Sequence, residues 1–300
     1  FGSKLTQFDS GHPDMWLTFA LASAVLLAVR RIYEKDLTAR FGDFSLSFLL
    51  MVFSLPAVLI LFLFFPVPQD ISALPWDFWW PLIIIWVILY PLQNYLLYRS
   101  LREGELSQVT PVSALLPVFN IVPSFFLLQE LPSVWGAAGI VTTVLATYLL
   151  LTDVRAGTKQ KFNLPVLLMV GTVICTAIGS TLDKVAVEVS TPVFYTFVNM
   201  LGASAVFLVL TFAYRQQHEL VRVKESFRTF ALLGVVMALA FVAFVTAFTL
   251  GPTSYTLAIR SGGFIIAALW GLFLLKESLS QRKMWALVLF VAGTVALAVG

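Results

Sequence analysis

Arg260 carries a charge inside an apolar run, and its side chain could bind an anion. It follows Leu257-Ala258-Ile259 and precedes Ser261 and two glycines. A charge within a membrane-spanning helix is costly, so such a residue marks either a functional site or a buried pair. A guanidinium could hold a carboxylate or phosphate through two parallel hydrogen bonds. We therefore expect Arg260, with Ser261 beside it, to bind an anionic group of a substrate. The alternatives are a structural ion pair and a position at a helix end.

Polar side chains in other apolar runs could line the same site. Tyr90 and Asn94 are four residues apart and therefore share one helix face, next to Pro91, which removes a helical hydrogen bond. Such a break within a membrane is tolerated only where protein or a water-filled cavity receives it. The residues that we expect to contact a substrate are Tyr90, Asn94, Asn120 and Asn199. The alternative for each is a hydrogen bond between helices without a ligand.

Two acid-lysine pairs, Glu34-Lys35 and Asp183-Lys184, stand near the ends of apolar runs in the two halves of the chain. Because they recur at matching positions, they could act as gate or proton-relay residues. The alternative, which we favour, is that they are interfacial anchors whose long side chains reach toward the membrane surface.

The sequence offers little material for catalysis inside a membrane. Its two histidines, His12 and His218, lie in polar segments, and its single cysteine, Cys175, lies in an apolar run. These residues cannot assemble a His-based metal site or a His-dependent hydrolase within the bilayer, and no glycine-rich phosphate loop is present. We therefore predict that the chain is not an enzyme and that it needs no cofactor or metal.

The composition requires that most of the chain lies in a membrane. Of 300 residues, 59% are hydrophobic and 12% are charged, with a mean hydropathy of +0.92. Soluble domains have about 45–50% apolar and about 25% charged residues. Apolar runs of about 20 residues, enough to cross a bilayer as helix, recur along the whole chain. The ten spans that we predict are 15–37, 44–65, 78–99, 108–128, 134–151, 164–187, 192–214, 228–250, 253–275 and 283–299.

An internal repeat divides these spans into two halves of five. The segment FFLLQELPS at 125–133 returns as LFLLKESLS at 272–280. An odd number of helices in each half forces the second half to enter the membrane from the opposite side. We therefore predict an all-α transmembrane fold, a ten-helix bundle of two inverted five-helix repeats around a central cavity. The expected segments are a polar tail at 1–14, repeats at 15–151 and 164–299, and a connecting loop at 152–163. The start Phe1-Gly2-Ser3, which lacks Met, is compatible with a remnant of processing or cloning.

The repeated segment aligns Glu130 with Glu277. Each glutamate lies just before a predicted helix start, where the helix dipole favours an anion. We therefore expect both residues to cap a helix or to form part of a gate, and we do not expect them to bind substrate.

The two halves resemble the EamA-like branch of the drug/metabolite transporter superfamily over about residues 15–299. The features that carry this resemblance are the Leu-x-Glu or Leu-Lys-Glu turn after the fourth helix and the glycines of the last helix, which are Gly136, Gly139 and Gly293. The resemblance implies a secondary transporter that opens a central cavity alternately to each side. It further implies export of a small polar metabolite such as an amino acid. The alternatives are a flippase for a lipid or lipid-linked sugar, which needs a lateral opening between helices, and a receptor or scaffold that transports nothing.

Most of the 19 Lys and Arg residues fall in predicted loops opposite the termini, and the exceptions are Lys4, Lys184 and Arg260. This bias assigns those loops to the cytoplasm, whereas similar transporters are often described with cytoplasmic termini. The expected partners are a small-molecule solute, the lipid bilayer and, as a candidate coupling ion, the proton. We expect no nucleic acid, because the basic residues behind the net charge of +3 lie at helix ends. The expected location is a bacterial or archaeal cytoplasmic membrane.

Overall fold

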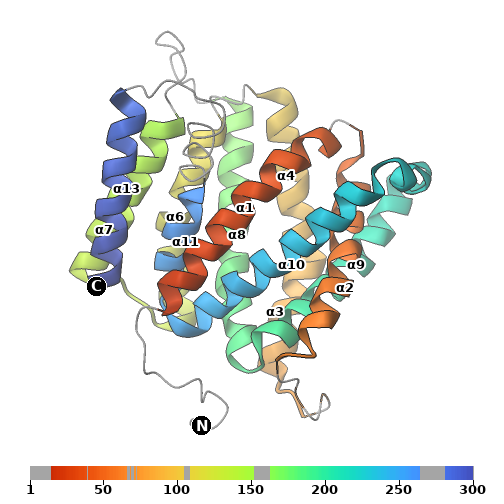
Figure 1. Ribbon diagram of the computed structural model, residues 1–300, viewed down its shortest axis with the longest axis horizontal. Coiled ribbons are helices and arrows are strands. Elements are labelled where there is room, and N and C mark those ends of the chain that lie inside the picture. The colour runs from red at the N-terminus through yellow and green to blue at the C-terminus, as the bar shows by residue number, and fades with distance from the viewer. Residues whose placement is uncertain are drawn as a thin grey trace.

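The computed structural model describes residues 15–38, 40–65, 68, 71, 73–104, 109–151, 163–263 and 281–299, and the regular elements within these ranges are helical. The elements of the first half are α1 (Met15–Thr38), α2 (Asp43–Leu61), α3 (Trp76–Ile84), η1 (Ile85–Leu89), α4 (Tyr90–Glu103), η2 (Thr110–Leu115), α6 (Leu116–Leu128) and α7 (Val134–Leu151). Those of the second half are α8 (Leu164–Glu188), α9 (Pro192–Ala213), η3 (Gln217–Ser226), α10 (Phe227–Leu250), α11 (Thr253–Ser261) and α13 (Gln281–Val299). Nine of the ten predicted spans begin in one of these helices (Figure 1). Residue 108, where the predicted fourth span begins, and the part of the predicted ninth span beyond residue 263 lie outside the described residues.

The helices have the length and hydropathy of membrane spans. Five segments are long and apolar enough to cross a bilayer, and they are Asp43–Leu61, Trp76–Glu103, Leu164–Glu188, Pro192–Ala213 and Gln217–Leu250. Shorter apolar helices occupy Met15–Arg30, Val112–Leu128, Val134–Leu149 and Met284–Val299. Large apolar side chains such as Val87, Phe126 and Val291 are more than half exposed on the outside of the bundle, as expected for a surface that faces lipid. The protein is a multi-pass integral membrane protein.

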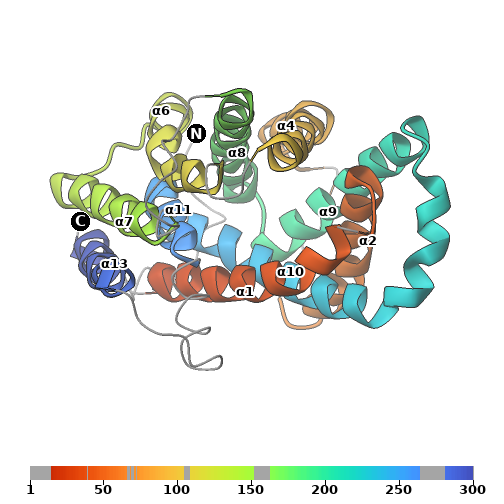
Figure 2. The same cartoon turned by 90° about the horizontal axis from the view of Figure 1, so that it is seen from above.

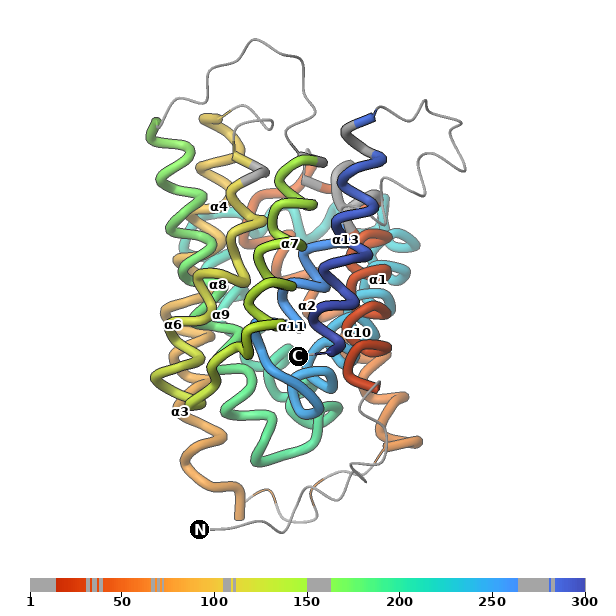
Figure 3. Tube along the Cα trace, turned by 90° about the vertical axis from the view of Figure 1, so that its left-hand side faces the viewer, coloured from red at the N-terminus to blue at the C-terminus, as the bar shows by residue number. Residues whose placement is uncertain are grey.

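The two halves pack against each other as inverted repeats. The second helices of the halves pair as α2 with α9, and the fifth helices pair as α7 with α13 (Figure 2). The first helix of each half also packs on the third span of the other half, α1 on α10 and α8 on α4. Exchanging the two halves turns the contact of α1 with α10 into that of α8 with α4, as expected for two copies of one repeat. The first helices, α1 and α8, run in opposite directions through the bundle (Figure 3).

The third span is not a regular helix, because η1 is a π-helical turn. The N–H of Tyr90 donates to the carbonyl of Ile85, five residues earlier, and Pro91 at the start of α4 has no N–H with which to continue the α-helical pattern. The sequence predicts a break at Pro91, and the wide turn lies directly before it. Such π-helical turns occur frequently at functional sites.

Candidate functional site

Five polar side chains from both halves gather inside the bundle, and we call them the central cluster: Tyr90, Asp183, Tyr195, Asn199 and Arg260. The Nδ2 atom of Asn199 donates to the hydroxyl of Tyr90 at 3.0 Å. The hydroxyl of Tyr195 donates to the carboxylate of Asp183. Arg260 interacts electrostatically with both Asp183 and Tyr90. Asp183, Tyr195 and Asn199 are buried, so the cluster combines one cation and one carboxylate away from the bundle surface.

The guanidinium of Arg260 lies on an aromatic ring. Its Cζ is 3.7 Å from the ring centre of Phe244 in α10, a cation–π contact of the kind that stabilises by about 0.5–2 kcal/mol. Within the described residues α11 ends at Ser261, so Arg260 lies in its last turn, where the helix dipole favours a cation. The sequence predicts a longer span, 253–275, whose part beyond residue 263 lies outside the described residues. Ser261, next to Arg260, is partly buried.

The two glycines after Ser261 allow close helix packing. A Cβ on Gly262 would lie 1.8 Å from the ring of Phe290 in α13. A Cβ on Gly263 would lie 2.8 Å from the carbonyl oxygen of Ala24 in α1. Both positions therefore require glycine, because neighbouring helices occupy the space that a side chain would need.

Trp86 of η1 extends the central cluster, whereas Asn94 lies outside it. The indole N–H of Trp86 donates to Oδ1 of Asn199 at 2.9 Å. Asn94 donates to the carbonyl of Tyr90 at 2.8 Å and accepts from the hydroxyl of Ser47 in α2 at 3.3 Å. Asn94 therefore connects α4 to α2.

Asn120 of α6 joins three helices. Its Nδ2 donates to the carbonyl of Ala177 at 3.0 Å and to the hydroxyl of Thr181 at 2.9 Å. Its Oδ1 accepts from Ser124 at 2.9 Å and from Ser254 at 3.1 Å. An amide side chain has two donor hydrogens and two acceptor sites, so these bonds occupy all four. This geometry favours the alternative of a hydrogen-bonded link between helices for Asn120.

Lys184 and Glu130 form an ion pair between the two halves at the end of the bundle where α11 begins. Lys184 also donates to the carbonyl of Gly251 at 2.8 Å, and Oε2 of Glu130 accepts from the backbone N–H of Thr253 at 3.0 Å. Glu188 lies 3.8 Å from the same ammonium. The sequence associates Glu130 with the start of the following helix, α7. In the structure the Glu130 carboxylate instead caps α11 of the other half, through the backbone N–H of Thr253. The chain leaves α6 through Gln129, whose backbone is left-handed, and the side chain of Glu130 that follows contacts Lys184 and Thr253.

Asp183 and Lys184 are adjacent in sequence yet bind different partners. Successive residues of an α-helix point about 100° apart, so Asp183 faces Tyr195 while Lys184 faces Glu130. The side chains of the matching pair, Glu34 and Lys35, lie outside the described residues, and so does Glu277.

Sequence reasoning did not identify Trp86, Tyr195 or Phe244. Trp86 lies four residues before Tyr90, and this spacing on one helix face was the available signal. No local pattern marks Tyr195 or Phe244, because their roles depend on helices distant in sequence. In the part of the chain that the structure describes, no group of three or more His, Cys, Asp or Glu residues gathers as a metal site would require.

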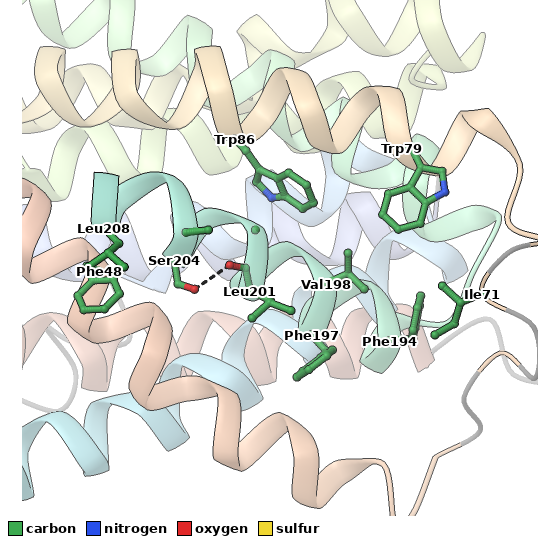
Figure 4. A pocket seen from close by; sticks show the side chains of 12 residues that line it. Phe48, Ile71, Trp79, Trp86, Phe194, Phe197, Val198, Leu201, Ser204 and Leu208 are labelled. Atoms are coloured by element: carbon green, nitrogen blue, oxygen red, sulfur yellow. Dashed lines mark hydrogen bonds between the residues drawn. The ribbon is translucent and has the colours of Figure 1, made fainter. Parts of the chain in front are cut away.

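A cavity of about 600 Å³, which we call the lateral groove, lies beside the central cluster. Figure 4 shows its side chains, with those of α9 in a row between α2 and the α3–η1 segment. Phe48 lines the groove from α2, Trp79 and Trp86 line it from α3 and η1, and Phe197 and Leu201 belong to the row on α9. Trp86 therefore borders both the groove and the cluster.

Comparison with known proteins gives a consistent picture of the fold. The family model described as the EamA-like transporter family matches residues 14–152 and again residues 163–299. No curated protein sequence matches the chain. One solved structure, whose title reads "Crystal structure of protein", superposes with a TM-score of 0.75 at 14% identity and covers 95% of this chain and 98% of its own. That similarity concerns the fold alone.

Proposed function

Because this chain belongs to the EamA-like transporter family, within the drug/metabolite transporter superfamily, we propose that it is a secondary transporter that exports a small polar organic metabolite such as an amino acid. The two segments matched by the family model correspond to the halves that we propose as repeats, 15–151 and 164–299, joined by 152–163. In our proposal these halves move relative to each other and open the central cluster alternately to the two sides of the membrane.

The observation that carries the proposal is the combination of Arg260 and Asp183 in one buried cluster. The two charged groups interact electrostatically, and Tyr90, Tyr195 and Asn199 supply hydroxyl and amide groups around them. An amino acid carries a carboxylate, which Arg260 could bind with both arms of its guanidinium. The ligands that we propose are Arg260, Ser261, Tyr90 and Asn199, with Asn94 and Asn120 in supporting positions.

We propose that Asp183 is the coupling residue and that the proton is the coupling ion. Among the described residues, the titratable and charged groups that interact with its carboxylate are Tyr90 of α4, Tyr195 of α9 and Arg260 of α11. Uptake of a proton by Asp183 would remove the negative charge that interacts with Arg260, and it would thereby change how strongly Arg260 attracts a substrate anion.

We propose that the Glu130–Lys184 pair closes one end of the bundle. The pair joins α6 of the first half to α8 of the second, and its backbone contacts at Gly251 and Thr253 tie in the α10–α11 turn. Opening that end would require these bonds to separate. By the internal repeat, Lys35 and Glu277 are the counterparts that we propose for the opposite end, with Glu34 in the place of Asp183.

A second candidate, a flippase for a lipid or lipid-linked sugar, is favoured by the lateral groove, because that function needs an opening between helices. Efflux of radiolabelled amino acids from proteoliposomes tests the first function, and translocation of a fluorescent lipid in the same vesicles tests the second. We expect amino acid efflux above that of protein-free vesicles and of vesicles containing Arg260→Ala protein. Lipid translocation without amino acid efflux would replace the first function with the second, and neither activity would reject both.

A further inference from the structure

The lateral groove is elongated and follows one helix. Its floor on α9 extends from Phe194 to Leu208, which at 1.5 Å per residue is roughly 20 Å of helix. Figure 4 shows these side chains in one row, with Trp79 and Trp86 on one side and Phe48 on the other. The shape therefore fits a long, thin ligand better than a compact one.

Two polar side chains of the groove, Ser204 and Trp86, are hydrogen-bonded within the protein. The hydroxyl of Ser204 donates to the carbonyl of Leu201 at 2.7 Å. The indole N–H of Trp86 donates to Asn199 at 2.9 Å. The groove accordingly presents mainly aromatic faces and methyl groups, which suit a hydrocarbon and offer little to a polar solute.

Gly202 allows Trp86 to lie directly on the floor of the groove. A Cβ on this glycine would lie 2.3 Å from the indole ring, so any larger residue would displace the ring. Trp86 also connects, through Asn199, to Tyr90 of the central cluster. A ligand in the groove would thus contact a side chain that is hydrogen-bonded to the proposed transport site.

The groove is continuous with the surface that faces lipid. Leu201 and Ile71, which line it, are 48% and 52% exposed, and Val87 and Ile88 of η1 are also exposed next to Trp86. At one end, two contacts join α2 to α4. One is the ion pair between Oδ1 of Asp43 and Nη2 of Arg102 at 2.5 Å, and the other is the hydrogen bond from the hydroxyl of Ser47 to Oδ1 of Asn94 at 3.3 Å. Because these helices span the membrane, the medium at the mouth of the groove is the hydrocarbon of the bilayer.

We propose that the lateral groove binds one hydrocarbon chain of a bilayer phospholipid, which lies along α9 with its side against the indole of Trp86. The volume of about 600 Å³ is within the range of ligand pockets, roughly 300–1,000 Å³. This site does not depend on the proposed function, because a lipid could occupy it whichever solute is transported.

Quenching of tryptophan fluorescence by brominated lipid tests the proposal on the full chain. The protein is reconstituted in phosphatidylcholine whose chains carry bromine, and separately in the same lipid without bromine. The emission of Trp86 is obtained as the difference between the unmodified protein and Trp86→Phe. Ala205→Phe fills the groove at an exposed position of α9, and Val209→Phe adds the same ring on α9 outside the groove.

We expect brominated lipid to remove most of the Trp86 emission, Ala205→Phe to restore much of it, and Val209→Phe to leave the quenching unchanged. If Ala205→Phe does not fold, Ala205→Cys alkylated after purification fills the groove in protein that is already folded. Trp86 emission that is insensitive to bromine, or equally quenched with the groove filled, would overturn the proposal. Amino acid efflux is measured separately, so its absence would not bear on lipid binding.

Discussion

Lys184 of α8 pairs with Glu130 of α6, so a largely buried ion pair joins the two halves of the chain. Its lysine and glutamate side chains are 8% and 22% exposed, whereas those of the Arg99–Glu103 pair on α4 are 43% and 40% exposed. Removing one partner of a buried pair leaves an uncompensated charge, and removing one partner of an exposed pair costs little. The two pairs therefore provide a matched comparison within one protein.

Glu130→Gln should destabilise the protein, because it keeps an acceptor for the N–H of Thr253 but removes the charge that faces Lys184. We expect the free energy of unfolding to fall by about 1–3 kcal/mol, seen as a lower midpoint of thermal unfolding in detergent. The control Glu103→Gln should change it by less than about 0.5 kcal/mol. The double variant Glu130→Gln/Lys184→Met should recover part of the loss. Equal shifts for the two single variants would contradict a structural role for the pair.

Arg260→Lys should keep the charge but lose the planar fork, and Arg260→Ala should lose both. We expect substrate binding and efflux to decrease in the order Arg, Lys, Ala. Binding is measured in detergent on variants that remain monodisperse, since loss of protein together with flux would indicate structural pairing alone. Arg99→Ala, on the exposed side of α4, serves as the control and should bind like the unmodified protein. Folded Arg260→Ala protein with undiminished efflux would reject the role.

Asn120→Ala should act on stability, because all four hydrogen-bonding positions of the amide are used within the protein. We expect the free energy of unfolding to fall by about 2–4 kcal/mol, as several buried polar groups lose a partner. Asn94→Ala is the comparison, and it should cost less because Asn94 is less buried and has fewer bonds. Unchanged stability of Asn120→Ala together with weaker substrate binding would instead assign Asn120 to the substrate site.

Cysteine labelling tests the topology. Lys224→Cys in η3 and Arg215→Cys before it should react from one side of the membrane, and Ser190→Cys between α8 and α9 should react from the other. The sequence further predicts that the loop around Lys159 shares the side of Lys224, opposite residue 300. The native Cys175 is buried, so background labelling should be low. Reaction of Ser190→Cys and Lys224→Cys from the same side would contradict the crossing of α9.

Helix number, helix order and the repeat could be predicted from the sequence, because the bilayer imposes a length and a hydropathy on every span. The central cluster could be predicted only in part. Arg260, Tyr90 and Asn199 are visible as polar residues in apolar runs, and the structure brings these three together. The partners of Glu130 and Asn120 were not predictable, because they depend on which faces of α8 and α11 turn inward, and hydropathy does not encode helix rotation in a membrane.

Because Asp183 and Lys184 are adjacent, α8 mechanically couples the central cluster to the end of the bundle. One side chain engages Tyr195 near Arg260 and the other engages Glu130 at the end of the bundle, and a single rigid backbone fixes the angle between them. Any twist of α8 about its own axis that reorients Asp183 must therefore swing Lys184 by the same angle. A change in the contacts of Asp183 and the separation of Lys184 from Glu130 would then be one motion. No chain of intermediate side chains would be needed to couple them.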